Sequence, residues 1–121
     1  MKILMIFTAL VLGGCTATAA RQMSGQISGI ASYYGAESGH RTANGEIFYP
    51  EGLSAAHRTL PFGTRLSVTN LATGQSCTVR INDRGPAAWT KHDLDLSTGA
   101  ARVCGLIHSG TARIAYSILG D

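Results

Sequence analysis

Charged residues are scarce in this chain of 121 residues, and neither sign dominates. They make up 14% of the sequence, and ten Lys and Arg against seven Asp and Glu give a formal net charge of +3. An excess this small and dispersed argues against a nucleic-acid partner. The low charge also leaves few charged helical faces, while 15 glycines indicate many turns.

Several signatures of catalysis and metal binding are missing. The chain has no Gly-x-Ser-x-Gly nucleophile elbow, no glycine-rich phosphate-binding loop and no Cys-x-x-Cys pair. The four histidines are never spaced as in zinc motifs. We therefore expect neither a metal nor another cofactor.

The longest apolar run lies at the start of the chain and is too short to span a bilayer as a helix. Residues 3–12 are apolar and lead through two glycines into Cys15, which resembles a bacterial lipobox. We predict a lipoprotein signal peptide at 1–14, and a lipidated Cys15 with a tether at 15–27. An ordinary signal peptide cut after Ala19 is the alternative. Acyl chains on Cys15 would anchor the protein to a membrane of the bacterial envelope, facing the periplasm.

Two cysteines remain if Cys15 is acylated, namely Cys77 and Cys104. An even number of cysteines in an oxidising compartment favours a disulfide. It would close a loop of about 27 residues, worth around 3 kcal/mol on the chain-entropy model. A pair of buried free thiols is the alternative.

Alternation of apolar and polar residues predicts a mostly β domain. The clearest pattern is a hairpin over residues 66–81, with one apolar and one polar face. Further strands are predicted at 29–34, 93–96 and 111–119. About six short strands indicate a small, mostly antiparallel barrel, because closing the sheet removes its edges.

A short helix is predicted between Ser97, a good N-cap, and Gly105. Residues 37–52 show no period and are predicted to form a loop. Within it, Asn44-Gly45 indicates a turn with positive φ that would orient the next residue, Glu46.

Four of the seven acidic residues are candidates for chemistry: Glu46, Asp83, Asp93 and Asp95. Asp83 lies in the turn Asn82-Asp83-Arg84-Gly85-Pro86, directly after the hairpin. Alternation puts Asp93 and Asp95 on one face of their strand. Paired carboxylates in a desolvated cleft perform glycoside chemistry, one holding a proton and the other ionised.

Structural roles are the alternative for these residues. Asp83 could pair with Arg84 or Arg80 and cap its own turn, and Asp95 could cap the helix. His57 lies between small residues and a Pro-x-Gly turn, which taken alone is more typical of a hydrogen-bonded structural histidine than of a catalyst.

Six motifs, in this order, resemble the rare lipoprotein A (RlpA) family: Gly29-Ile-Ala-Ser-Tyr-Tyr-Gly, Thr42-Ala-Asn-Gly-Glu, Ala55-Ala-His-Arg-Thr-Leu-Pro-Phe-Gly-Thr, Val68-Thr-Asn-Leu, Val79-Arg-Ile-Asn-Asp-Arg-Gly-Pro and Asp95-Leu-Ser. The resemblance runs over residues 28–119 and implies an RlpA-like domain there. Its fold would be all-β, a six-stranded double-psi β-barrel with one or two short helices, shared with expansins. The resemblance also implies an endolytic lytic transglycosylase. Such enzymes cut peptidoglycan between N-acetylmuramic acid and N-acetylglucosamine and leave a 1,6-anhydromuramyl end.

The same resemblance implies roles for individual residues. Glu46, His57 and Asp83 fall at the family's functional positions, and Asp95 falls where expansin-like relatives hold a key aspartate. Asp83 is expected to protonate the glycosidic oxygen and then take the proton of the muramic C6 hydroxyl, with Asp95 the second candidate for the acid. Residues of the same motifs expected to bind substrate are Tyr33, Tyr34, Asn44, Arg58 and Arg84.

A binding module without catalysis is the rival hypothesis. An expansin-like domain would grip glycan through exposed aromatic side chains, for which Tyr33, Tyr34, Tyr49 and Trp89 are the candidates. In either case we expect a monomer whose partners are peptidoglycan strands and, through the lipid, a membrane.

Overall fold

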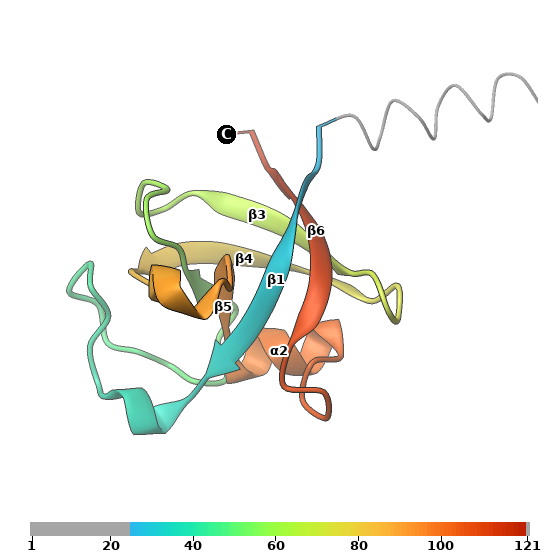
Figure 1. Cartoon of the computed structure of the whole chain (residues 1–121). Helices are drawn as coiled ribbons and strands as arrows, with labels where there is room; N and C mark the ends of the chain where they lie inside the picture. The colour runs from blue at the N-terminus through green and yellow to red at the C-terminus, as the bar shows by residue number, and fades with distance from the viewer. Residues whose placement is uncertain (1–24, 121) are drawn as a thin grey trace, which may run out of the picture.

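Six strands close into a barrel in the computed structural model, which describes residues 25–120 (Figure 1). Around the barrel the strands follow the order β1-β5-β2-β4-β3-β6. This confirms the predicted all-β class and six-stranded double-psi barrel. The elements are β1 (Ile27–Tyr34), η1 (Ala36–Ser38), β2 (Ser54–Ala56), β3 (Arg65–Asn70), β4 (Ser76–Asp83), η2 (Ala88–Thr90), β5 (Leu94–Ser97), α2 (Thr98–Cys104) and β6 (Ala112–Ile118).

The predicted signal peptide, the lipidated Cys15 and most of the tether lie outside the described residues. Over residues 25–120, no helix combines the length and apolarity needed to cross a membrane.

The predicted hairpin is formed by β3 and β4. Leu66 pairs with Val79 and Val68 with Cys77, and all four side chains are buried in the barrel. Their polar neighbours in sequence point outward, as period-two alternation requires. The hairpin carries the chain to Asp83 at the end of β4.

Two pairs of strands are parallel, β1 with β5 and β2 with β4, and the remaining four neighbouring pairs are antiparallel. The barrel is therefore mostly antiparallel, as predicted. β2 was not located from the sequence, because its three small residues carry no period-two pattern. It lies between β4 and β5 and is buried throughout.

The predicted helix is α2, and its caps are those expected. Ser97 Oγ accepts a hydrogen bond from the amide of Ala100 at 3.2 Å, and Gly105 takes the left-handed conformation at φ +77°. Ser97 Oγ also accepts from the Ser54 amide at 3.3 Å and donates to the Gly52 carbonyl at 2.5 Å. One buried hydroxyl thus joins the helix to the start of β2.

Cys77 in β4 and Cys104 at the end of α2 are both buried, and their sulfur atoms lie 2.7 Å apart. The structure holds them as free thiols. Their disulfide stays a prediction, although the fold brings the two residues together.

Candidate active site

One row of paired residues crosses four neighbouring strands and carries both candidate acids. Ser32 of β1 pairs with Asp95 of β5, Asp95 with Ala56 of β2, and Ala56 with Asp83 of β4. Residues paired in this way point to the same face of a sheet. Asp95 and Asp83 therefore flank Ala56 on one face, two strand spacings or about 10 Å apart between their Cα atoms.

A cavity of about 310 Å³ opens over this row. Its lining consists of Tyr34, Ser38, Arg41, Ala56, Asp83, Arg84 and Asp95. Ala56, which is paired with both acids, lies in the lining between them, and we call it the floor of the cavity. Neither this cavity nor any other part of residues 25–120 contains a cluster of three His, Cys, Asp or Glu side chains that could hold a metal ion.

Asp83 is held by three donors. Its Oδ1 accepts hydrogen bonds from the amides of Ala43 at 2.8 Å and Arg84 at 2.9 Å, and its Oδ2 accepts from the Tyr34 hydroxyl at 3.0 Å. Three donors suit a carboxylate, which only accepts. Asp83 forms no ion pair with Arg80 or Arg84, but its bond from the Arg84 amide caps its own turn, as the structural alternative expected.

Tyr34 reaches Asp83 from β1, and a second contact fixes its ring. The ring stacks on Phe48 with centroids 4.8 Å apart and planes 9° from parallel. Burial, and then the negative charge of Asp83, raise the pKa of the Tyr34 hydroxyl, so it remains a donor at neutral pH. The predicted substrate-binding residue Tyr34 therefore lines the cavity and also positions Asp83.

Asp95 is held more loosely than Asp83. Its Oδ1 accepts one side-chain hydrogen bond, from Ser32 Oγ at 3.0 Å. Burial raises the pKa of Asp95; the Ser32 bond and His92 oppose this rise, while the charges of Asp83 and Glu37 add to it. Asp95 does not cap α2, since Ser97 does. The surroundings of Asp95 therefore favour its protonated form.

Glu46 lies in a neighbouring hollow of about 400 Å³, beside Tyr49 and Leu53. Its carboxylate takes two hydrogen bonds from the Arg80 guanidinium, at 2.8 and 3.1 Å, and one from Asn82 Nδ2 at 3.3 Å. The bonds from Arg80 lower the pKa of Glu46, so it is ionised. Glu46 is therefore suited to binding and not to proton donation.

The turn before Glu46 has the predicted geometry. Gly45 lies at φ +90°, and Asn44 Oδ1 accepts a hydrogen bond from the Glu46 amide at 3.1 Å. The Asn44 amide donates to the Asn82 carbonyl at 3.3 Å. Asn44 thus ties its turn to the residue before Asp83.

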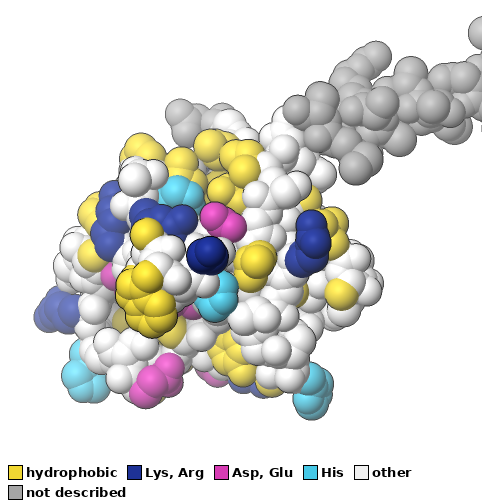
Figure 2. Space-filling model, viewed as in Figure 1, with side chains coloured by type: hydrophobic (Ala, Val, Ile, Leu, Met, Phe, Trp, Pro, Cys, Tyr) yellow, Lys and Arg dark blue, Asp and Glu magenta, His cyan; other side chains and the backbone are white. Residues whose placement is uncertain are grey.

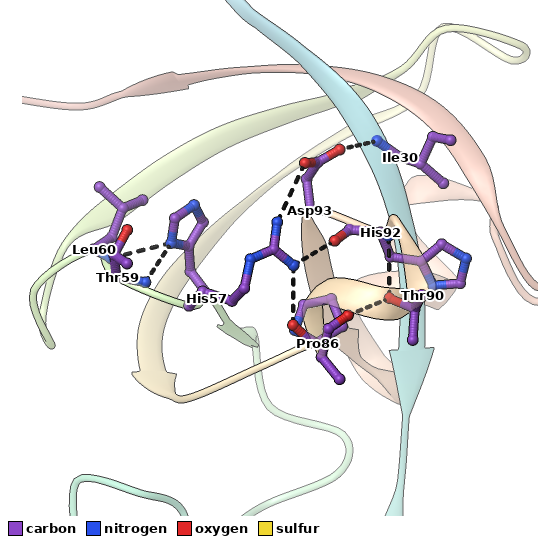
Figure 3. A network of polar contacts seen from close by, with 10 residues as sticks. Ile30, His57, Thr59, Leu60, Pro86, Thr90, His92 and Asp93 are labelled. Carbon is purple, nitrogen blue, oxygen red and sulfur yellow. Dashed lines mark hydrogen bonds and ion pairs between the residues drawn. The ribbon is translucent and has the colours of Figure 1, made fainter.

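His57 does not line the cavity between the two acids. Its Nδ1 accepts hydrogen bonds from the amides of Thr59 at 3.1 Å and Leu60 at 3.0 Å, so this nitrogen carries no proton (Figure 3). Burial, then the charges of Arg58 and Arg84, lower the pKa of His57. The His57 amide donates to the Asp83 carbonyl at 3.2 Å, which joins the two residues through the backbone.

Asp93 and Arg58 lie outside the cavity and contact each other. Asp93 Oδ1 is 3.6 Å from Arg58 Nη2, and Asp93 Oδ2 accepts from the Ile30 amide at 2.9 Å (Figure 3). The alternation predicted Asp93 and Asp95 on one strand face. Asp93 lies immediately before β5, however, and only Asp95 lines the cavity. Arg84, by contrast, lines the cavity, and its guanidinium carbon lies 3.9 Å from the centre of the Phe62 ring.

The four candidate aromatic residues do not form one strip. The Tyr33 hydroxyl donates to the Ile107 carbonyl at 3.1 Å and its ring packs on the core, while Tyr34 stacks on Phe48. Tyr49 is 67% exposed and Trp89 is 84% exposed. Figure 2 shows the molecule from the same side as Figure 1, with η2 in front of the barrel. On this face, hydrophobic, basic, acidic and histidine side chains lie close together, so the surface is mixed and not a strip of aromatic rings.

Residues of the site that were missed from the sequence include Ser32, Ala56 and Arg80, together with Ser38 and Arg41 of the cavity lining. Ser32 could have been found, because it is two residues from Tyr34 and therefore on the same strand face. Ala56 and Arg80 carry no such signal, because their neighbours are set by the strand order and by the loop that carries Glu46.

Comparison with known sequences gives the same family as the motifs. A sequence model described as "Lytic transglycolase" matches residues 26–116. A probable endolytic peptidoglycan transglycosylase RlpA of Nostoc is 56% identical over 95 residues, covering 76% of this chain and 25% of its own. The corresponding Synechocystis protein is 58% identical over 92 residues, covering 75% and 28%. The Campylobacter jejuni endolytic peptidoglycan transglycosylase RlpA is 47% identical over 93 residues, covering 76% and 34%.

This chain therefore spans about a quarter to a third of the length of these curated relatives. Solved structures agree on the fold. A Clavibacter michiganensis expansin, solved as a mutant with cellohexaose, superposes with a TM-score of 0.63 at 24% identity, over 79% of this chain and 51% of its own. A Streptomyces papain inhibitor superposes with a TM-score of 0.64 at 18% identity, over 81% and 97%.

Proposed function

Because this chain belongs to the RlpA family of lytic transglycolase domains, we propose that it is an endolytic peptidoglycan lytic transglycosylase. It cleaves the bond between N-acetylmuramic acid and N-acetylglucosamine and leaves a 1,6-anhydromuramyl end. The observation that carries this proposal is the pair of carboxyl groups, Asp83 and Asp95, on either side of Ala56 in one cavity.

The two acids divide the proton transfers between them. Asp95, whose pKa is raised by burial, donates its proton to the glycosidic oxygen as the bond from C1 breaks. Asp83, which accepts three hydrogen bonds, faces the positive charge that develops at C1 and takes the proton of the C6 hydroxyl as that oxygen closes on C1. No water is consumed, and exchange with solvent returns the proton to Asp95. The sequence hypothesis gave both steps to Asp83; the environment of Asp95 supports giving it the first.

Glu46 and His57 support these acids without exchanging the proton. Ionised Glu46, with Arg80 and Asn82, offers paired donors and acceptors to the hydroxyl and amide groups of a neighbouring sugar. His57 fixes the backbone of Asp83. Both roles agree with the motif resemblance, which puts these residues at functional positions.

Asp95→Asn and Asp83→Asn test the proposal directly. Each variant is expected to lower the release of anhydro-muropeptides from purified peptidoglycan by about 100-fold or more, the usual contribution of a positioned acid or base. Mass analysis of the soluble products measures this. Glu51→Gln is the matched control, because Glu51 forms an exposed ion pair with Arg102 away from the cavity. Wild-type product release from either Asn variant would remove that residue from the mechanism.

A glycan-binding module is the second candidate, and the exposed rings of Tyr49 and Trp89 favour it. Sedimentation with purified peptidoglycan, followed by mass analysis of the supernatant, separates the two functions. Binding with no anhydro products from the wild-type chain would support the module and reject the enzyme.

We also propose that the domain works as a monomer in the bacterial envelope, held to a membrane by acyl chains on Cys15 and facing the periplasm. The lipobox-like sequence supports this. Labelling of growing cells with a radioactive or alkyne-bearing palmitate is expected to mark the wild-type chain and not Cys15→Ser. Equal labelling of both would reject the anchor.

A further inference from the structure

The loop between β4 and β5, residues 84–93, holds a large aromatic ring in solvent. It leaves β4 directly after Asp83 and enters β5 one residue before Asp95, so its two ends are fixed at the two acids. Trp89, the one tryptophan of the chain, lies in the middle of this loop and is 84% exposed.

The backbone around Trp89 is nonetheless well ordered. Thr90 Oγ1 donates to the Ala87 carbonyl at 2.7 Å and accepts from the His92 amide at 3.1 Å. Lys91 takes the left-handed conformation, with φ +63°, which is uncommon for a residue other than glycine. These contacts fix the backbone while leaving the ring in water. A fixed backbone with an exposed ring is what a preorganised binding surface needs, because a segment that is already ordered loses less conformational entropy when its ligand binds.

Arg58 fixes the loop from the outside. Its Nη1 donates to the carbonyl oxygens of Pro86 at 3.0 Å and His92 at 2.7 Å, on either side of Trp89. Its Nη2 faces Asp93 Oδ1 at 3.6 Å. Figure 3 draws these contacts as the dashed lines that run to Pro86, His92 and Asp93 from the side chain between them. The hydrogen-bonding groups of the Arg58 guanidinium are thus used by the loop, which suits a positioning residue better than a substrate ligand.

Asp93 connects this arrangement to the barrel wall. Its Oδ2 accepts from the Ile30 amide of β1 at 2.9 Å. The carboxylate fits there because residue 29 is glycine: a Cβ atom at Gly29 would lie 2.7 Å from Asp93 Oδ2. Arg58 and Asp93 therefore link β1 to both ends of the segment that carries Trp89.

We propose that Arg58 and Asp93 are positioning residues that hold Trp89 as a stacking surface for one pyranose ring of the glycan, next to the bond between the two acids. The inference rests on the proposed function for the identity of the glycan. The face of a pyranose ring presents C–H groups, which pack on an indole ring. The Trp89 ring is exposed to solvent and is therefore available for this packing.

Trp89 fluorescence tests the inference independently of turnover, because no other tryptophan contributes. The probe is a soluble, peptide-free glycan fragment prepared from peptidoglycan. It is expected to shift the emission of the wild-type chain on titration. Trp89→Ala should weaken binding of the fragment, followed by calorimetry, about tenfold, and Trp89→Phe should retain part of it.

Arg58→Ala and Asp93→Ala are expected to lower the fluorescence anisotropy of Trp89 and to raise KM about tenfold, with a smaller change in kcat. Arg58→Lys should restore less than half of the lost affinity, because an ammonium group cannot contact both carbonyls and Asp93 in the same fixed geometry. Arg58→Ala combined with Trp89→Ala should bind no more weakly than Trp89→Ala alone. Arg102→Ala, which removes an exposed ion pair elsewhere, is the control.

Two results would overturn the inference: unchanged fragment binding in the folded Trp89→Ala protein, or unchanged Trp89 anisotropy together with wild-type KM in Arg58→Ala. Failure of the proposed function is a separate result. In that case the wild-type chain binds the fragment through Trp89 but releases no anhydro product.

Discussion

Ala56, which lies between Asp83 and Asp95, has only a methyl group as its side chain and so leaves room in the cavity. It is 3% exposed and pairs with both acids. Ala56→Val would add two methyl groups to the cavity and not to the packed core, which Ala55 faces. We expect product release to fall by about 100-fold, because a sugar displaced by about 1 Å loses its alignment with the acids.

The stability of Ala56→Val distinguishes this effect from misfolding. Overpacking a core costs about 1–3 kcal/mol, whereas filling an open cavity should cost less than about 1 kcal/mol. Urea unfolding measures the difference. Ala72→Val, at an exposed turn position, is the matched control and should keep full activity. A fully active Ala56→Val protein would show that substrate does not approach this floor.

Asp95 gives a pH dependence whose sign follows from burial. Its folded-state pKa is raised above the ordinary carboxyl value, so between these two values the folded chain binds more protons than the unfolded chain. The stability of the wild type therefore falls as pH rises through this window and stays reduced above it. Activity that needs protonated Asp95 should fall as pH rises through the same folded-state pKa.

Asp95→Asn removes this titration. We expect the variant to be more stable than the wild type at neutral pH, with the difference shrinking as pH falls from the raised folded-state pKa of Asp95 toward the ordinary carboxyl pKa of about 3.9, and constant below that value. Urea unfolding across this pH range measures both curves. Parallel curves would mean that the burial of Asp95 does not favour its proton. Glu51→Gln, at an exposed ion pair, should follow the wild-type curve.

At the scale of elements, Gly99 sets two effects against each other. Replacing a helical glycine by alanine ordinarily stabilises a helix by about 1 kcal/mol. Here a Cβ atom would lie 2.3 Å from the carbonyl oxygen of Glu51, and the Gly99 amide donates to the Pro50 carbonyl at 2.8 Å. Because the clash is with backbone, the loop carrying Tyr49 must move away from α2.

We therefore expect Gly99→Ala to lower the free energy of unfolding by about 1–3 kcal/mol, against the helix propensity. Thermal unfolding followed by circular dichroism measures the change. Gly120→Ala is the matched control, since nothing lies within 4 Å of a Cβ atom there. A stabilised Gly99→Ala protein would mean that the loop does not pack on the helix as described.

The sequence alone predicts an element when all the signals for it, such as apolar alternation, a turn or a helix cap, lie in the residues of that element. β3, β4 and α2 were predicted because apolar alternation, a turn and two caps all lie in consecutive residues. β2 was not located, because Ser54–Ala56 has no periodicity and becomes a strand through its neighbours on both sides. Asp83 was identified as a candidate acid, but not its donors Tyr34 and Ala43, which come from distant segments.

At the scale of the whole molecule, the strand order assembles the site. Asp83 and Asp95 are close in sequence but lie on strands separated by β2, which comes from much earlier in the chain. The loop joining the two acids must therefore pass over the end of β2, and this is the loop that Arg58 fixes and that holds Trp89. Closure of the barrel therefore brings the residues of the proposed site together.

The thiol pair lies between β4 and the end of α2. Cys77 and Cys104 are buried with their sulfur atoms 2.7 Å apart, so a disulfide needs little movement of β4 or α2. In an exported chain, an oxidised thiol oxidase or another disulfide would take up the two electrons, with loss of both thiol protons. We expect the chain purified from the envelope to carry this disulfide and to lose about 3 kcal/mol of stability on reduction.

Unfolding with and without reductant measures this loss, and the double variant Cys77→Ser, Cys104→Ser should be insensitive to reductant. Two free thiols titrated in the denatured, unreduced protein would reject the disulfide. The expected loss is large beside the total stability of about 5–15 kcal/mol of a small domain. Since the disulfide would join β4, which ends in Asp83, to α2, which follows the strand of Asp95, reduction should also weaken the alignment of the two acids. Product release should then fall at temperatures where the reduced wild-type chain begins to unfold and the oxidised chain does not.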